Sequence, residues 1–129
     1  MSRESPIFTH LYDMLRWLLP LVGTLPRAHR SGLARQLPDA AFRLQTALLR
    51  AAKQPERTAL YLREADAALA ELRLLLRLTK DLAAIPFNQY EMAVRLLDPI
   101  GRLLGGWQRT VESRLLRASP VEQGPVEPS

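Results

Sequence analysis

The sequence predicts an all-α protein folded as an up-down-up-down four-helix bundle. Four long segments carry apolar residues three and four positions apart, which is the spacing of an amphipathic helix. Proline-containing connections separate the segments, and no run of alternating apolar and polar residues indicates a strand. Short connections between long amphipathic helices favour antiparallel neighbours, and therefore a bundle.

The first two helices are expected over residues 6–24 and 28–54. Ser5-Pro6 is typical of an N-cap followed by the first helical position, where the missing N–H of proline costs nothing. Pro20 and Pro38 predict a bend in each helix, because each removes an internal hydrogen bond. The predicted apolar faces are Ile7, Leu11, Met14, Leu15, Leu18, Leu21, Val22 and Leu25 in the first helix, and Leu33, Leu37, Ala40, Leu44, Ala47, Leu48 and Ala51 in the second.

The last two helices are expected over residues 56–84 and 88–117, with Asn88 as N-cap of the fourth and Glu91 as its capping-box partner. The predicted core positions are Tyr61, Ala65, Ala68, Leu69, Leu72, Leu75, Leu76 and Thr79, followed by Ala93, Leu96, Leu97, Ile100, Leu103, Leu104, Trp107 and Val111. Residues 118–129 show no helical pattern. We therefore expect a bundle over residues 1–117 and a disordered tail over 118–129.

The third helix carries a second apolar line that one core face does not require. Leu60, Ala67, Leu74 and Leu78 lie roughly 130° from the core stripe, at about 100° of rotation per residue. This line fits either a wide stripe in a tightly packed bundle or a subunit interface formed by Leu60, Leu74 and Leu78.

Three glycines interrupt the fourth helix just before a tryptophan. Gly101, Gly105 and Gly106 each cost about 1 kcal/mol of helix stability relative to alanine. Two explanations remain open: close helix packing or a bend, and close approach of a partner chain or a phosphate backbone.

The charge of the chain is basic. There are 18 Lys and Arg against 13 Asp and Glu, and residues 1–117 alone hold 18 bases and 11 acids, a net charge of +7. Such a surface either keeps a helical protein in solution or binds nucleic acid through its phosphates. The candidate phosphate-binding residues are Arg35, Arg43, Arg50 and Lys53 of the second helix, Arg73, Arg77 and Lys80 of the third, and Arg95, Arg102 and Arg109 of the fourth. Asp39 is the only acid among the second-helix group, which makes that group the most specific of the three.

Nothing in the sequence forms a catalytic or metal-binding constellation. The chain has no cysteine, and its two histidines, His10 and His29, are not accompanied by a cluster of carboxylates. No phosphate-binding glycine loop follows a strand. We therefore expect no catalytic residues, no metal, no cofactor and no enzymatic activity. Without a signal region or an apolar run long enough to cross a membrane, we expect a cytoplasmic protein with no membrane partner.

Two stretches resemble those of a known family. They are Leu72-Arg73-Leu74-Leu75-Leu76-Arg77-Leu78 and, more specifically, Ile100-Gly101-Arg102-Leu103-Leu104-Gly105-Gly106-Trp107. With the flanking pattern over about residues 8–110, the chain resembles the accessory variability determinant (Avd) proteins of diversity-generating retroelements. The wider family includes four-helix proteins encoded within intervening sequences of bacterial ribosomal RNA.

The resemblance implies a non-catalytic accessory protein. Avd proteins are four-helix bundles that form a basic homopentameric ring, bind nucleic acid and associate with the reverse transcriptase of the element. The resemblance therefore implies that the partners of this chain are that reverse transcriptase, the template RNA and DNA, and further copies of the chain. The alternatives are a free-standing RNA-binding bundle of the ribosomal intervening-sequence type and a plain monomeric helical adaptor.

Overall fold

The computed structural model describes the backbone of residues 5–123 and the side chains of residues 5–118. Every regular element in this part of the chain is helical, which confirms the all-α class. The elements are α1 (Pro6–Val22), the 3₁₀ turn η1 (Arg27–His29), α2 (Leu33–Lys53), the 3₁₀ turn η2 (Pro55–Arg57), α3 (Thr58–Asp81) and α4 (Phe87–Gln123).

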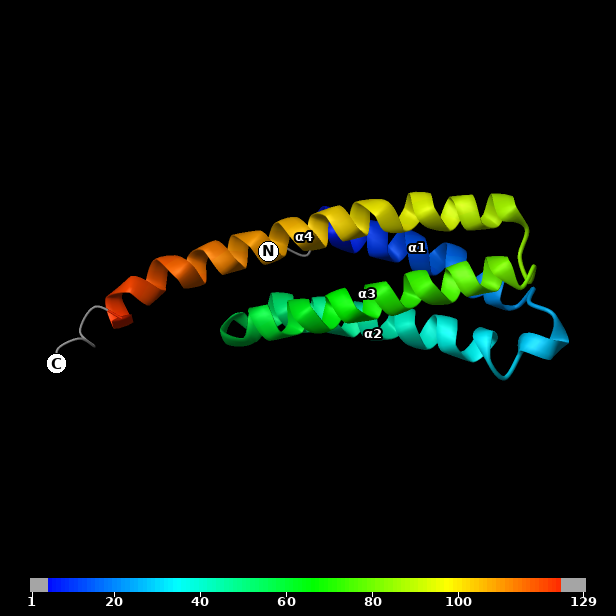
Figure 1. Ribbon diagram of the computed structural model, residues 1–129, viewed down its shortest axis with the longest axis horizontal. Helices are drawn as coiled ribbons and strands as arrows, with labels where there is room; N and C mark the ends of the chain where they lie inside the picture. The colour runs from blue at the N-terminus through cyan, green and yellow to red at the C-terminus, as the bar shows by residue number, and fades with distance from the viewer. Residues whose placement is uncertain (1–4, 124–129) are drawn as a thin grey trace.

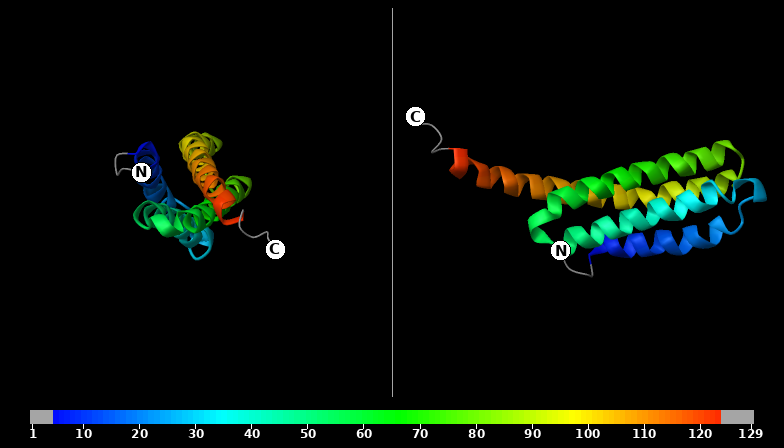
Figure 2. Two further views of the ribbon diagram at one scale, coloured as in Figure 1. Left: turned by 90° about the vertical axis from the view of Figure 1, so that its left-hand side faces the viewer. Right: turned by 90° about the horizontal axis from the view of Figure 1, so that it is seen from below.

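The four helices pack as an antiparallel bundle (Figure 1). Each helix packs against two neighbours: α1 contacts α2 and α4, and α3 contacts α2 and α4. The α2–α3 pair forms the most extensive contact. The two further views show that the last part of α4 projects beyond the other three helices (Figure 2).

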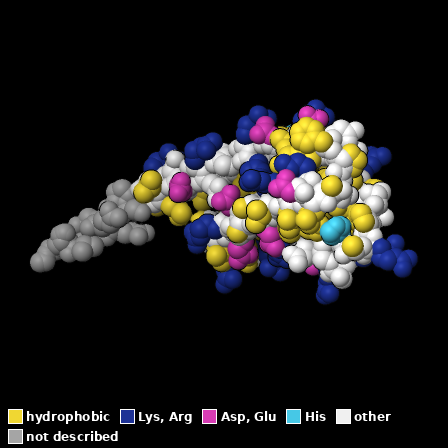
Figure 3. All heavy atoms as spheres, turned by 45° about the vertical axis from the view of Figure 1, so that its right-hand side comes forward, with side chains coloured by type: hydrophobic (Ala, Val, Ile, Leu, Met, Phe, Trp, Pro, Cys, Tyr) yellow, Lys and Arg dark blue, Asp and Glu magenta, His cyan; other side chains and the backbone are white. Residues whose placement is uncertain are grey.

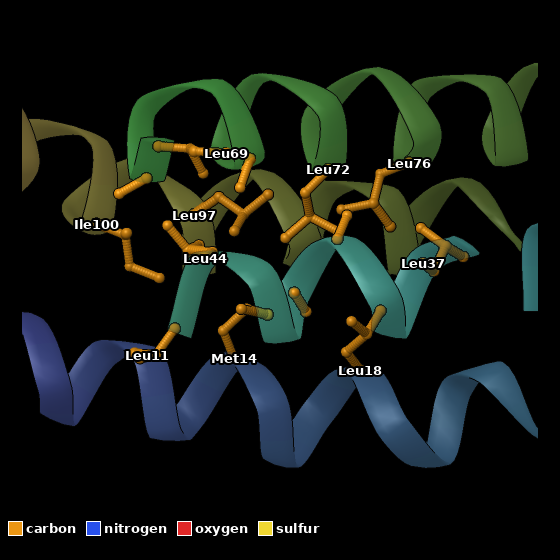
Figure 4. Close-up of a cluster of buried hydrophobic side chains, with 14 of the residues drawn as sticks. Leu11, Met14, Leu18, Leu37, Leu44, Leu69, Leu72, Leu76, Leu97 and Ile100 are labelled. Atoms are coloured by element: carbon orange, nitrogen blue, oxygen red, sulfur yellow. The ribbon is translucent and has the colours of Figure 1, made fainter. Parts of the chain in front are cut away.

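The core lies along the axis of the bundle, and all four helices contribute to it (Figure 4). Most of the predicted core positions are buried, and the others are partly exposed and pack against the buried cluster. Leu62 and Ala41, which were not predicted, are buried as well. The side chains labelled there come from α1 (Leu11, Met14, Leu18), α2 (Leu37, Leu44), α3 (Leu69, Leu72, Leu76) and α4 (Leu97, Ile100). Each large side chain removed from water contributes about 1.5–3 kcal/mol, so these interlocking stripes hold the bundle together.

The predicted start of the second helix was wrong by five residues. Residues 27–29 form the separate turn η1, and Gly32 has φ −102° and ψ −92°, which is not helical. The carbonyl of Gly32 accepts the N–H groups of Arg35 and Gln36, so α2 begins at Leu33, where the apolar spacing also begins.

The predicted cap of the fourth helix was also wrong. The carbonyl of Pro86 accepts the N–H groups of Gln89 and Tyr90, so α4 starts at Phe87 and Asn88 lies inside its first turn. The preceding helix, α3, ends at Asp81 because Ala83 has a positive φ of 57°, and the N–H of Ala84 then bonds back to the carbonyl of Thr79.

The fourth helix extends further than expected. It continues past residue 117 to Gln123, so the first six residues of the expected tail are helical. The remainder, residues 124–129, lies outside the described residues. Pro20 and Pro38 are both accommodated inside helices. None of the helices over residues 5–123 combines the length and hydrophobicity that a membrane span requires.

Candidate nucleic-acid and subunit interfaces

The second apolar line of α3 lies on the surface of the protomer. Leu60, Leu74 and Leu78 are 41%, 66% and 44% exposed, and Ala67 between them is exposed as well. Leu74 lies mostly in solvent, whereas Leu60 and Leu78 are partly covered by the bundle, so the exposures favour the subunit-interface interpretation over the wide-core one. Exposed leucines aligned along one helix favour contact with a second macromolecule.

The packing of one protomer explains why a glycine occupies position 101. A Cβ built on Gly101 would overlap the guanidinium group of Arg73, which crosses from α3 onto α4. There the Nη2 atom of Arg73 donates a hydrogen bond of 3.5 Å to the carbonyl of Leu97. At this position the close approach comes from an arginine of the same chain, and Arg73 is correspondingly less available to a phosphate.

The packing of one protomer does not explain the glycines at positions 105 and 106. A Cβ at Gly105 would meet only Nη1 of Arg109, at 3.4 Å, and a Cβ at Gly106 would lie 3.9 Å from Nη2 of the same residue. These are ordinary contacts with the end of a flexible side chain. The structure of one protomer therefore leaves both glycines open to the second explanation, close approach of a partner.

Two arginines of α2 contact side chains of α3. Arg43 donates a hydrogen bond of 2.6 Å to Glu71, 28 residues away in the sequence. Arg50 lies over the ring of Tyr61, with 5.9 Å between its Cζ atom and the ring centroid. Both arginines line an open groove of about 670 Å³ between α2 and α3, which also contains Asp39, Glu64 and Glu71. Asp39 is the only acid that α2 itself contributes, as the sequence indicated, but Glu64 and Glu71 of α3 add negative charge beside it, so the α2 group is less specific for phosphate than one helix suggests.

The basic cluster at the end of α3 is partly neutralised. Asp81 lies 4.0 Å from Nε of Arg77 and 3.2 Å from Nζ of Lys80. Lys80 also sits over the ring of Tyr90, 4.7 Å from its centroid, so α4 holds this lysine from the other side. One carboxylate thus serves two of the predicted phosphate ligands.

The stripe on α4 is also uneven. Arg102 pairs with Asp98 one turn earlier, at 3.0 Å, whereas Arg95 and Arg109 form no ion pair within the described side chains. The same holds for Arg35 and Lys53 of α2. In the space-filling view, basic side chains alternate with acidic and hydrophobic ones and do not form one continuous patch (Figure 3).

The sequence did not identify the acidic and aromatic side chains that contact the predicted phosphate-binding cations. Asp98 and Asp81 could have been found, because each lies four residues from an arginine of its own helix. Glu71 and the two tyrosines could not, since they reach their partners only after the helices pack.

The fold defines a four-helix bundle with an exposed leucine line and a divided basic surface. A family model described as bAvd-like matches residues 7–111, which is most of the chain. The chain therefore belongs to the bAvd-like family, a family of accessory, non-catalytic proteins. A comparison with curated proteins finds no match.

Proposed function

We propose that the chain is the non-catalytic accessory subunit of a diversity-generating retroelement. In this function it binds the reverse transcriptase of the element together with nucleic acid, and it supports mutagenic retrohoming, in which cDNA is made on a template RNA. Membership of the bAvd-like family over residues 7–111 carries the proposal.

The exposed leucine line supports assembly from several copies. In the proposed homopentamer, Leu60, Leu74 and Leu78 of one copy pack against its neighbour and leave water. Fully burying an exposed leucine contributes about 1.5–3 kcal/mol. These three side chains are partly covered in the protomer, so each would supply roughly half of that to the contact between copies.

The cations that form no ion pair supply the proposed nucleic-acid contact. Arg35, Lys53 and Arg95 reach solvent without a carboxylate partner among the described side chains, so they can bind phosphate without first losing an internal contact. Each phosphate neutralised releases counterions, which makes the affinity strongly dependent on salt.

Two matched triple variants test the phosphate contact. One replaces Arg35, Lys53 and Arg95 by Gln, and the control replaces the ion-paired Arg43, Arg77 and Arg102 by Gln, so both lose three positive charges. RNA binding by fluorescence anisotropy across a salt series should show a slope about 2 units smaller for the first variant, at about 0.7 per phosphate on a single strand. Equal losses in both variants would mean that only net charge matters.

Assembly is tested separately by light scattering. Leu74→Glu should lower the molar mass from that of a pentamer toward that of a monomer, because it places a charge in the proposed contact. Leu116→Glu is the matched control, since Leu116 is a similarly exposed leucine on α4. A monomeric wild-type chain would contradict the ring.

Co-expression with the reverse transcriptase and template RNA of the element tests the function itself. The three components should purify together and yield template-directed cDNA. Binding of RNA without retention of the reverse transcriptase would instead favour the free-standing RNA-binding bundle, and a gene located within ribosomal RNA would support that alternative.

A further inference from the structure

The projecting end of α4 lies outside the region shared with the family. The family match ends at residue 111, whereas α4 continues to Gln123. Figures 1 and 2 show this part of the helix extending past the ends of the other three. An isolated helical segment of about 12 residues is marginal in water, so an amphipathic one is suited to contact with a partner.

The apolar stripe of α4 continues into this segment. Trp107 and Val111 pack, partly exposed, at the edge of the core, and Leu115 follows four residues later with 54% of its surface exposed. The three side chains share one face of the helix, at the spacing that buries Ile100 and Leu104 deeper in the bundle. At the end of the bundle this stripe meets the connection between α2 and α3.

A groove of about 260 Å³ lies between the α4 stripe and that connection. Apolar residues predominate in its lining, although polar atoms contribute nearly half of the lining that faces solvent; the residues are Ala51, Ala52, Pro55, Thr58, Trp107, Val111, Arg114 and Leu115. An apolar groove between two helices is the geometry into which an amphipathic helix inserts its leucine-type side chains.

The charges around the groove are predominantly positive. Lys53 and Arg57 flank the groove-lining Ala52, Pro55 and Thr58 in the sequence, and Arg114 lines the groove itself. Among the side chains of residues 5–118, none of these three cations forms an ion pair, and the acids that adjoin groove-lining residues in the same way are Glu56 and Glu112, so the cations outnumber the acids by one. The groove therefore favours an acidic occupant.

A second copy of this helix end does not fit that description. It would bring its own Arg109, Arg114 and Arg117 against those of the first copy, with like-charge repulsion as the result. A sugar–phosphate backbone would satisfy the cations but would leave the apolar lining in contact with water.

We propose that this groove, here called the α4 groove, is a docking site for an acidic amphipathic helix of a partner protein. Apolar side chains of that helix enter between Trp107, Val111 and Leu115. Its carboxylates pair with Lys53, Arg57 and Arg114. The site requires neither RNA nor reverse transcriptase. It shares Lys53 with the proposed phosphate contact, and the variants that test the groove leave Lys53 unchanged so that the two proposals can fail separately.

The test uses the full chain and a labelled synthetic peptide of about five helical turns, with leucines at positions i, i+3, i+4 and i+7 and glutamates on the flanks. A scrambled peptide of the same composition has the same charge without the apolar stripe. By fluorescence anisotropy we expect the amphipathic peptide to bind at least about tenfold more tightly than the scrambled one, a difference of about 1.4 kcal/mol.

The substitutions form two matched pairs. Leu115→Glu and Arg114→Glu should each weaken peptide binding by about fivefold or more, because they alter the groove lining. Leu116→Glu and Arg117→Glu, on the next positions around the same helix, should change it by less than about twofold. Equal affinity for the two peptides, or equal effects within each pair, would overturn the proposal. The proposal would also be overturned if single-stranded RNA displaced the peptide completely while the groove variants and the control variants lost RNA affinity equally. The helix end would then bind phosphate through its charge, and the groove would have no special part in binding.

Discussion

Replacing the glycines of α4 by alanine tests why the helix contains them. The loss of helix stability that each glycine causes is offset either by contacts within one protomer or by contacts with a partner. Alanine in a helix interior is about 1 kcal/mol more favourable than glycine. At Gly105 the new Cβ would meet only the end of the flexible Arg109 side chain, at 3.4 Å, so nothing in the protomer opposes the gain. Gly105→Ala should therefore stabilise the monomeric bundle by about 1 kcal/mol.

Gly101→Ala should behave differently. Its Cβ would displace the Arg73 guanidinium, which then loses its hydrogen bond of 3.5 Å to the carbonyl of Leu97. A hydrogen bond of ordinary geometry contributes about 0.5–1.5 kcal/mol, and this one is long, so the loss offsets most of the gain. We expect a net change within about 0.5 kcal/mol of zero, smaller than that of Gly105→Ala.

Urea unfolding followed by far-UV circular dichroism measures both effects. The Leu74→Glu background is used because assembly would otherwise add to the apparent stability. If Gly105→Ala destabilised this background by about 1 kcal/mol or more, the glycine would serve the protomer and the reasoning would be refuted. If it stabilised the monomer while weakening assembly or RNA binding in the unmodified chain, a partner would approach the helix at that point.

Three further predictions concern the bundle. Leu44→Ala should destabilise it by about 2–5 kcal/mol in thermal or urea unfolding, because Leu44 is fully buried at the centre of the core. A double-mutant cycle on Arg43 and Glu71 should give a coupling below about 1 kcal/mol that disappears at high salt, since both side chains are about half exposed. Trp17→Phe should cost about 1 kcal/mol or slightly more by the same assay, because Trp17 donates a 3.0 Å hydrogen bond to Gln89 that joins α1 to α4.

The buried face of each helix could be predicted because helical spacing is a local property. Residues such as Leu37 and Leu72 lie on a stripe that the sequence alone defines, and burial follows from it. Helix ends were less predictable. The start of α2 depends on the backbone of Gly32, and the start of α4 on the carbonyl of Pro86 accepting two N–H groups.

The basic surface could be predicted only in part, for a physical reason. A sequence gives the number of charges on one helix, but the field at a surface depends on every helix that adjoins it. Arg43 looked available until Glu71 of α3 was placed beside it, and the approach of Arg73 to Gly101 likewise depends on the packing of α3 against α4. Rotation alone placed Leu74 away from the centre of the core stripe, but whether a wide core would cover it was left open until the packing of the helices showed it to be exposed.

The separation of the available cations connects assembly to nucleic-acid binding. Arg35 and Lys53 stand near opposite ends of α2, 18 residues apart, which is about 27 Å at 1.5 Å per residue. Between them, Arg43 is already paired with Glu71 and Arg50 lies over Tyr61. One protomer therefore offers a strand a few separated contacts and no continuous track. Copies placed side by side would repeat these contacts, and linked weak contacts raise the overall affinity by about 10²–10⁴ without any new one. On this reasoning Leu74→Glu should lower RNA affinity much more strongly than Leu116→Glu, which adds the same negative charge, because only the first breaks the array that makes weak contacts sufficient.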